Sequence, residues 1–282
     1  MNYHSDSVPH TSEIHLFVSD LSRSINFYEK IIGFEVLYKA SDRAVFTTNG
    51  ETPLLTIEQT NLKRDFPSTG LYHFALLVPE RKDLANVLKH LLSTGYPLQG
   101  ASDHAVSEAI YLGDPDGNGI EIYVDRPSKQ WNWEEDQVVM TTNALNAEEL
   151  MKEATSGVFE GLPENTILGH VHLQVSDLKE AKDFYQNGLG LKIVSQLGHH
   201  AVFASYGGYH HHIGLNTWQS ANALPSKEGS TGLKWFSLVF TSELERSKCV
   251  EQVKKFSNVW RKDDDYYTND PSGNRIRLSL KK

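Results

Sequence analysis

One internal repeat constrains the fold of this chain more than any other feature. Residues 14–34, IHLFVSDLSRSINFYEKIIGF, align without gaps on residues 171–191, VHLQVSDLKEAKDFYQNGLGL, with nine identities in 21 positions. Each copy reads as an alternating strand, a Ser-Asp pair that opens a helix, a Phe-Tyr pair on its buried face and a glycine that ends it. The repeat predicts that the chain is assembled from copies of one supersecondary unit.

A second pair of similar segments follows these two copies. Residues 71–92 and 233–256 each read as a strand and then a helix. Both lead to a related turn, DPDGNGIE at 114–121 and DPSGNRIR at 270–277. The chain therefore contains four units, each a strand, a helix and several further strands. We place these units at roughly 12–60, 70–125, 168–217 and 232–280.

The 282 residues suffice for two ordinary domains. We expect a first domain over residues 1–126, with units one and two, and a second over 167–282, with units three and four. Residues 127–166 form the connector, which we expect to be ordered and anchored by Trp131 and Trp133.

Composition excludes several classes of partner. The formal net charge of −9 argues against nucleic acid and anionic membrane surfaces, which both attract basic proteins. The N-terminal sequence is polar, and no apolar run is long enough to span a bilayer. The single cysteine, Cys249, rules out an internal disulfide and is typical of a reducing compartment. We therefore expect a cytoplasmic protein.

The end of the second unit carries the most informative motif, in residues 102–124. Two apolar strands flank a turn dense in glycine, aspartate and proline, so this segment predicts a β-hairpin. Glu121 lies on the second strand between two isoleucines, and Tyr111 and His104 precede it. A carboxylate there is either exposed, paired or bound to a cation. An isolated Glu121 would be read as a surface residue, but its neighbours favour a site.

The order His104, Ile110-Tyr111, Asp-Pro-x-Gly, Glu121 resembles the signature of extradiol ring-cleavage dioxygenases, although Ser102 departs from its first position. Four βαβββ units with this turn are similar to the vicinal oxygen chelate superfamily, which includes glyoxalase I, bleomycin-resistance proteins and these dioxygenases. Within this superfamily, the sequence most resembles the catechol 2,3-dioxygenase-like proteins. The resemblance implies an α+β fold in which four βαβββ modules form two curved, open-barrel mixed sheets.

The resemblance also implies a divalent metal held by the first strand of one module and the first and last strands of its partner. The implied ligands are His73 and Glu121 of module two with His170 of module three. Two imidazoles and one carboxylate suit non-haem Fe(II), and Mn(II) accepts the same ligands. Module four has Trp235 and Arg277 at the matching places, so it resembles a degenerate copy.

This ligand set requires module two to pair with module three. The pairing more common in extradiol enzymes, one with two and three with four, would instead bring Glu13 or His15 to His73 and Glu121. We favour the two-three pairing, because the run YHHHIGL at 209–215 places a further expected histidine in module three. We expect this run to lie on a strand, with His211 facing the site and the other two histidines on the opposite face.

The implied reaction is the insertion of both atoms of O₂ into a catechol-type substrate. The resemblance implies that His211 is the acid–base residue and that Tyr111 and His104 form hydrogen bonds with the substrate oxygen. The partners are then a small aromatic diol and O₂, and whether the chain forms a homo-oligomer stays open. Two alternatives keep the fold: a glyoxalase I-like metal-dependent isomerase or lyase with four ligands, and a non-enzymatic binder of the bleomycin-resistance type.

Overall fold

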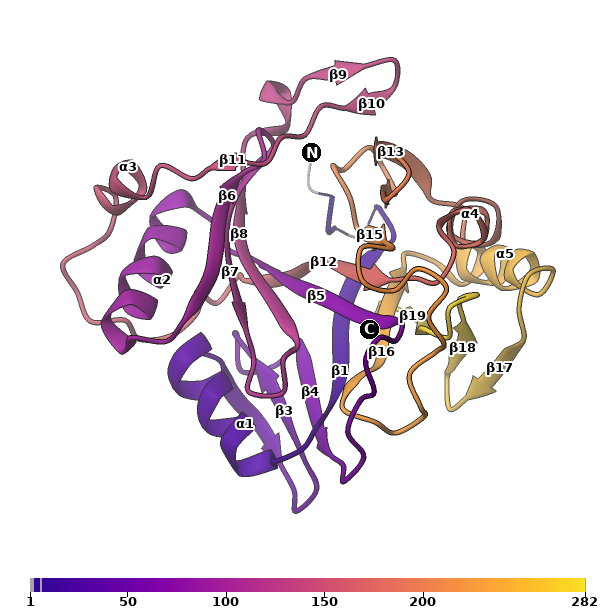
Figure 1. The fold of residues 1–282 in the computed structure, drawn as a ribbon, viewed down its shortest axis with the longest axis horizontal. Helices are drawn as coiled ribbons and strands as arrows, with labels where there is room; N and C mark the ends of the chain where they lie inside the picture. The colour runs from indigo at the N-terminus through magenta and orange to yellow at the C-terminus, as the bar shows by residue number, and fades with distance from the viewer. Residues whose placement is uncertain (1–2, 6, 282) are drawn as a thin grey trace.

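The computed structural model describes residues 3–5 and 7–281, so residues 1, 2 and 282 at the predicted domain ends lie outside it. Two large curved sheets make up the fold (Figure 1). One has eight strands, in the order β17 (Val259–Lys262), β18 (Asp265–Asn269), β19 (Arg275–Leu280), β16 (Gly232–Phe240), β1 (His10–Val18), β4 (Leu55–Gln59), β3 (Arg43–Thr47) and β2 (Glu35–Lys39).

The second sheet has nine strands. Their order is β11 (Asn143–Ala144), β6 (Leu98–Asp103), β7 (Ser107–Gly113), β8 (Gly119–Asp125), β5 (Gly70–Leu77), β12 (Ile167–Gln174), β15 (Ile213–Asn216), β14 (Ala201–Ser205) and β13 (Lys192–Leu197). Both sheets mix parallel and antiparallel pairs. The predicted α+β fold of four modules in two curved sheets is confirmed.

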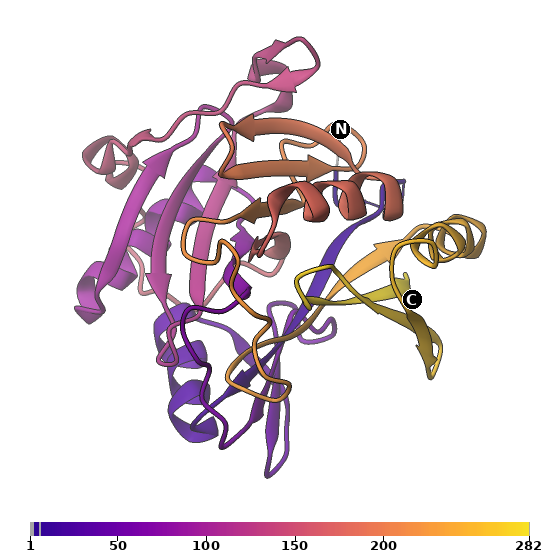
Figure 2. The same ribbon diagram turned by 45° about the vertical axis from the view of Figure 1, so that its right-hand side comes forward.

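Each sheet joins modules from both halves of the chain. Antiparallel pairing of β5 with β12 joins module two to module three, and pairing of β1 with β16 joins module one to module four. In Figure 2 the indigo N-terminal strand accordingly runs beside strands of the C-terminal quarter. The two-three pairing is confirmed. The divisions at residues 126 and 167 separate halves of the sequence, and each sheet draws on both halves.

The helices instead group within each half. α1 (Leu21–Phe27) and its π-helical end η1 (Tyr28–Ile32) lie beside α2 (Arg81–Thr94), and α4 (Leu178–Asp183) with η3 (Phe184–Gly188) lies beside α5 (Glu243–Val253) (Figure 1). Among the described helices, none is both long and apolar enough to cross a membrane.

The repeated sequence explains how these helices start and pack. Asp20 and Asp177 cap their helices by accepting backbone N–H groups, as Ser-Asp predicts. Tyr28 and Tyr185 are fully buried, in agreement with a core-facing Phe-Tyr pair.

The connector contains the 3₁₀ turn η2 (Ser128–Gln130), the hairpin β9 (Trp133–Glu134) and β10 (Gln137–Val138), and the short helix α3 (Ala147–Met151). Trp131 is buried and packs on Tyr209, so it anchors the connector as expected. Trp133 is 38% exposed on the hairpin, and the prediction that it too anchors the connector is wrong.

Candidate metal centre

Three neighbouring strands bring His73, Glu121 and His170 together. His73 lies on β5, Glu121 on β8 and His170 on β12, and all three side chains are buried. Ala75 of β5 is the register partner of both Glu121 and His170, so its small side chain leaves the space between them. Among the described residues, this is the one group of three or more histidine, cysteine or acidic side chains whose ligand atoms all lie within 4.8 Å of one another.

The distances within this group fit one face of an octahedron. Glu121 Oε2 lies 3.0 Å from His73 Nε2 and 3.3 Å from His170 Nε2, and the two nitrogens are 3.3 Å apart. With metal–ligand bonds of about 2.1 Å, ligands at right angles lie about 3 Å from each other. One divalent ion can therefore contact all three atoms, and the remaining octahedral positions are free for other ligands.

The electrostatics also suit a cation. Burial alone would raise the pKa of Glu121, but His170 and His73 outweigh it and hold that pKa well below its ordinary value. Burial lowers the pKa of His170 to about 4, although Glu121 opposes the shift. At neutral pH the carboxyl is thus ionised, which is the state that binds metal, and a bound ion would displace any proton from the two imidazoles. A carboxylate buried at this place needs a compensating positive charge nearby.

A glycine on β8 allows the close approach of His73. Gly119 is the register partner of His73, and a Cβ atom on it would overlap the carbonyl oxygen of Tyr72 and lie 2.9 Å from His73 Cβ. The absence of a side chain at Gly119 therefore lets β8 approach β5 closely enough to position His73.

The equivalent place in the other sheet holds an ion pair. Arg277 Nη2 lies 2.6 Å from Glu13 Oε2, and its guanidinium stacks over the ring of Trp235. His15 lies 3.2 Å from Glu58. Here an arginine supplies the positive charge, as expected for a degenerate module four. The structure does not bring Glu13 or His15 to His73, so the alternative ligand set is not assembled.

The predicted pair His104 and Tyr111 is formed beside the triad. The Tyr111 hydroxyl lies 2.6 Å from His104 Nε2, and His104 Nδ1 lies 2.6 Å from the carbonyl oxygen of Thr141. A carbonyl oxygen only accepts, so Nδ1 of His104 donates to it, which leaves Nε2 as the nitrogen that can accept from the Tyr111 hydroxyl. Tyr111 also pairs in register with Glu121, and its ring centre is 5.9 Å from that of His73. Burial and the charge of Glu121 raise the pKa of Tyr111, so its hydroxyl stays protonated.

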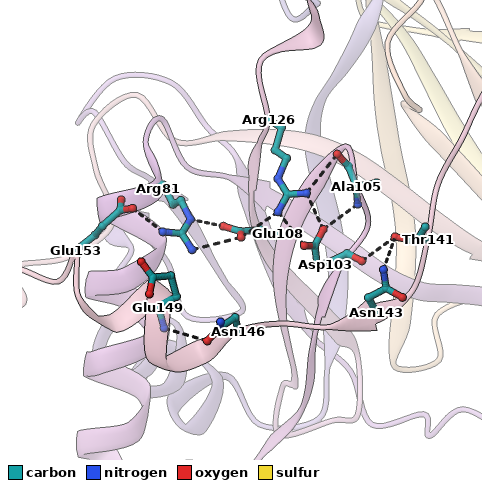
Figure 3. Close-up of polar contacts among 10 residues, drawn as sticks. All are labelled: Arg81, Asp103, Ala105, Glu108, Arg126, Thr141, Asn143, Asn146, Glu149 and Glu153. Carbon is teal, nitrogen blue, oxygen red and sulfur yellow. Dashed lines mark hydrogen bonds and ion pairs between the residues drawn. The ribbon is translucent and has the colours of Figure 1, made fainter. Parts of the chain in front are cut away.

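A network of charged residues holds the turn that carries His104 (Figure 3). Arg126 donates to both oxygens of Asp103, at 2.9 and 2.8 Å, and Asp103 also accepts the N–H of Ala105. Arg126 further contacts the buried Glu108, which accepts from Arg81 of α2 as well. The residues on both sides of His104 are thereby fixed to the end of β8.

His211 lies against the triad, but the local structure differs from the prediction. Its ring centre is 4.1 Å from that of His170. The strand β15 begins at Ile213, so His210, His211 and His212 belong to the loop before it. The predicted placement of His210 and His212 on the opposite face of that strand is therefore also wrong, and both side chains are fully buried. Strand alternation does not apply in a loop, where packing beneath the connector decides the side-chain directions.

Several further ring-bearing residues lie close to the triad. His172 lies 5.0 Å from His73, ring centre to ring centre, and Tyr72 and Trp218 contact it in turn. Phe203 lies between His172 and His211. These rings place aromatic surface beside the triad. Only the position of His172, two residues after His170, gave a sequence signal.

Comparison with known proteins agrees with this geometry. A model of the Glyoxalase/Bleomycin resistance protein/Dioxygenase superfamily matches residues 7–122 and 167–278. A catechol-2,3-dioxygenase of Bacillus subtilis is 45% identical over 256 residues, which is 89% of each chain. A metallothiol transferase, FosB of Bacillus licheniformis, is 36% identical over 108 residues, which is 38% of this chain and 69% of its own.

Solved structures show the same fold at low sequence identity. A candidate dioxygenase of Bacillus subtilis superposes with a TM-score of 0.67 at 14% identity, covering 96% of this chain and 84% of its own. Glyoxalase I from Zea mays gives a TM-score of 0.58 at 17% identity, covering 96% and 92%.

The chain belongs to the Glyoxalase/Bleomycin resistance protein/Dioxygenase superfamily. Within it, the long match to a catechol-2,3-dioxygenase makes the chain an enzyme of the extradiol dioxygenase type.

Proposed function

We propose that this protein opens the ring of a catechol-type substrate beside its two hydroxyl groups, with both atoms of O₂ entering the product and Fe(II) as the cofactor. The observation that carries the proposal is the buried facial set of two histidines and one glutamate, with a paired tyrosine and histidine next to it. The name of the 45% identical relative supports the same substrate class.

In this proposal His73, Glu121 and His170 hold the ion. When bound, Fe(II) would supply open positions for diol and O₂ together, the electrons that O₂ chemistry requires, and a charge that lowers the pKa of a diol hydroxyl. Mn(II) is the competing ion, because the same ligand set accepts it.

The protein supplies orientation and proton transfer. Tyr111 can donate to a diol oxygen when its hydroxyl rotates away from His104 Nε2, 2.6 Å distant. His211 is the acid–base group, because its ring lies on that of His170 and it is 8% exposed. Burial and the surrounding histidines hold the pKa of His211 well below its ordinary value, so it starts as a neutral base. The rings of Tyr72, His172 and Phe203 exclude water from an aromatic substrate.

Anaerobic reconstitution with Fe(II) or Mn(II), followed by catechol and air-saturated buffer, tests this proposal. We expect a yellow ring-opened semialdehyde and the uptake of one O₂ per catechol, both dependent on the metal. A metal-loaded protein that leaves catechol, methylcatechols and chlorocatechols unchanged, with no O₂ uptake, would contradict it. Isomerisation of a thiohemiacetal by that same sample would replace it with the glyoxalase-like reaction.

A further inference from the structure

A chain of hydrogen bonds leads from the metal-site histidine His211 to a carboxylate at the end of β8. His211 Nδ1 lies 2.8 Å from His210 Nδ1, and His210 Nε2 lies 2.8 Å from Asp125 Oδ1. His210 is fully buried, and Asp125 lies four residues after Glu121 on the same strand. The proposed reaction uses neither residue.

The donors in this chain can be assigned from the chemistry of its two ends. An ionised carboxylate only accepts hydrogen bonds, so His210 Nε2 carries the proton that bonds Asp125. With the Nε2 proton directed at Asp125, Nδ1 of His210 is the nitrogen that can accept, and we assign the hydrogen in its bond with His211 to His211 Nδ1. His211 Nε2 is consequently the nitrogen without a proton.

That remaining nitrogen is the one available to a substrate. Among the described residues, none forms a hydrogen bond with His211 Nε2. This nitrogen is also not one of the fully buried polar atoms that lack a partner, so it keeps some exposed surface. The neighbouring His212 differs, because its Nδ1 accepts the N–H of Tyr206 and its Nε2 contacts the carbonyl oxygen of Tyr3. Of the three consecutive histidines, His210 alone bonds His211.

We propose that Asp125 and His210 are positioning residues that fix the ring orientation and the tautomer of His211, so that Nε2 is presented as a proton acceptor. The role in catalysis rests on the proposed ring cleavage. A substrate hydroxyl gives its proton to Nε2, while the Nδ1 proton of His211 stays in its bond with His210. The same arrangement returns that proton from Nε2 to the product without any rotation of the ring.

The charge of Asp125 makes this tautomer the preferred one. Asp125 Oδ1 also accepts the hydroxyl of Tyr209 at 3.2 Å, and that hydroxyl lies 2.7 Å from the hydroxyl of Tyr123. These partners hold the carboxylate without contacting His211. Removing Tyr209's hydroxyl should therefore leave the tautomer of His211 intact, whereas removing Asp125 should release it.

Nitrogen NMR of protein labelled with ¹⁵N-histidine tests the tautomer directly and without metal. The signals of His211 are assigned by their loss in His211→Gln. In the unmodified protein we expect the proton on Nδ1 of His211. In Asp125→Ala and in His210→Phe we expect both tautomers to appear. Tyr209→Phe is the matched control and should keep the original signals.

Kinetics of the iron-loaded proteins test the consequence. Asp125→Ala and His210→Phe should keep their metal content and their KM within about twofold, while kcat falls about 100-fold, as for a misplaced general base. Tyr209→Phe should retain most of kcat. A proton on Nε2 of His211 in the unmodified protein, or an unchanged tautomer and kcat in Asp125→Ala, overturns the proposal. If the unmodified protein cleaves no catechol, the proposed function fails, but the nitrogen signals still decide whether Asp125 fixes the tautomer.

Discussion

The hydroxyl of Tyr28 donates to Asp114 Oδ2 at 2.9 Å, joining the helix of module one to the closing turn of module two. Tyr185 and Asp270 form the same bond at 3.1 Å between modules three and four. Both aspartates also accept two backbone N–H groups of their own DPxGN turns. The repeated Phe-Tyr pair and the repeated turn are thus two parts of one joint, which links the modules within each half of the chain.

Tyr28→Phe should weaken this joint. Asp114 is buried, so losing one donor leaves a carboxylate oxygen less well satisfied, and we expect the free energy of unfolding to fall by about 1–2 kcal/mol. Urea denaturation measures it. Tyr38→Phe is the control, because Tyr38 is half exposed and should change little. Equal stability of the two variants would show that the bond contributes nothing measurable.

Asp270 should give the stability a pH dependence. Burial raises its pKa from 3.8 to about 6, although hydrogen bonds from Asn274 and Tyr185 oppose the shift. Between these values the folded state holds the proton and the unfolded state does not. This contribution is therefore complete below pH 3.8 and is lost as pH rises through 6, by on the order of 3 kcal/mol.

Urea denaturation of the wild type and of Asp270→Asn between pH 4 and 7 measures this contribution. The stability difference between the two proteins should favour the wild type more at pH 4 than at pH 7. A difference that is independent of pH would show that Asp270 keeps an ordinary pKa.

The sequence predicted the parts of this molecule that follow local patterns. Two pairs of similar segments located the four modules, and the helix caps Asp20 and Asp177 follow from Ser-Asp before an apolar face. The resemblance of the hairpin named Glu121, Tyr111 and His104, which the structure brings to one place.

Other features depend on tertiary contacts that no local pattern encodes. His210 and His211 read as a strand, but Tyr209 packs beneath Trp131 of the connector and the segment folds as a loop. Asp125 lies 85 positions from His210, so nothing in the sequence links the two. Trp131 and Trp133 lie two positions apart in the sequence, but Trp131 is buried, whereas Trp133 lies on the hairpin β9–β10 and is exposed.

Gly119→Ala should damage the metal centre from the backbone side. The new Cβ would overlap the backbone of β5 at Tyr72, so the two strands must separate and His73 must shift. We expect at least a tenfold weaker affinity for Fe(II), measured by anaerobic titration. Gly157→Ala is the control, because its Cβ would meet nothing within 4 Å and its backbone is not left-handed. Equal affinities in both variants would mean that β8 can yield at this position.

Arg126→Gln should loosen the turn that carries His104. Asp103 loses two hydrogen bonds, and His104 then holds Tyr111 less firmly. We expect kcat to fall about tenfold with metal content unchanged. Arg81→Gln serves as the comparison, because Arg81 also binds Glu108 but not Asp103. If both variants lose activity equally, the effect belongs to Glu108 rather than to the His104 turn.

The metal content of His170→Ala after anaerobic reconstitution with Fe(II) tests the central claim most directly, with His15→Gln as the matched variant in the other sheet. His170 belongs to the group of three ligand atoms, whereas His15 contacts Glu58. We predict about one ion per chain in the wild type and in His15→Gln, and less than about a tenth of an ion in His170→Ala. Full occupancy in His170→Ala together with its loss in His15→Gln would contradict a centre built between modules two and three.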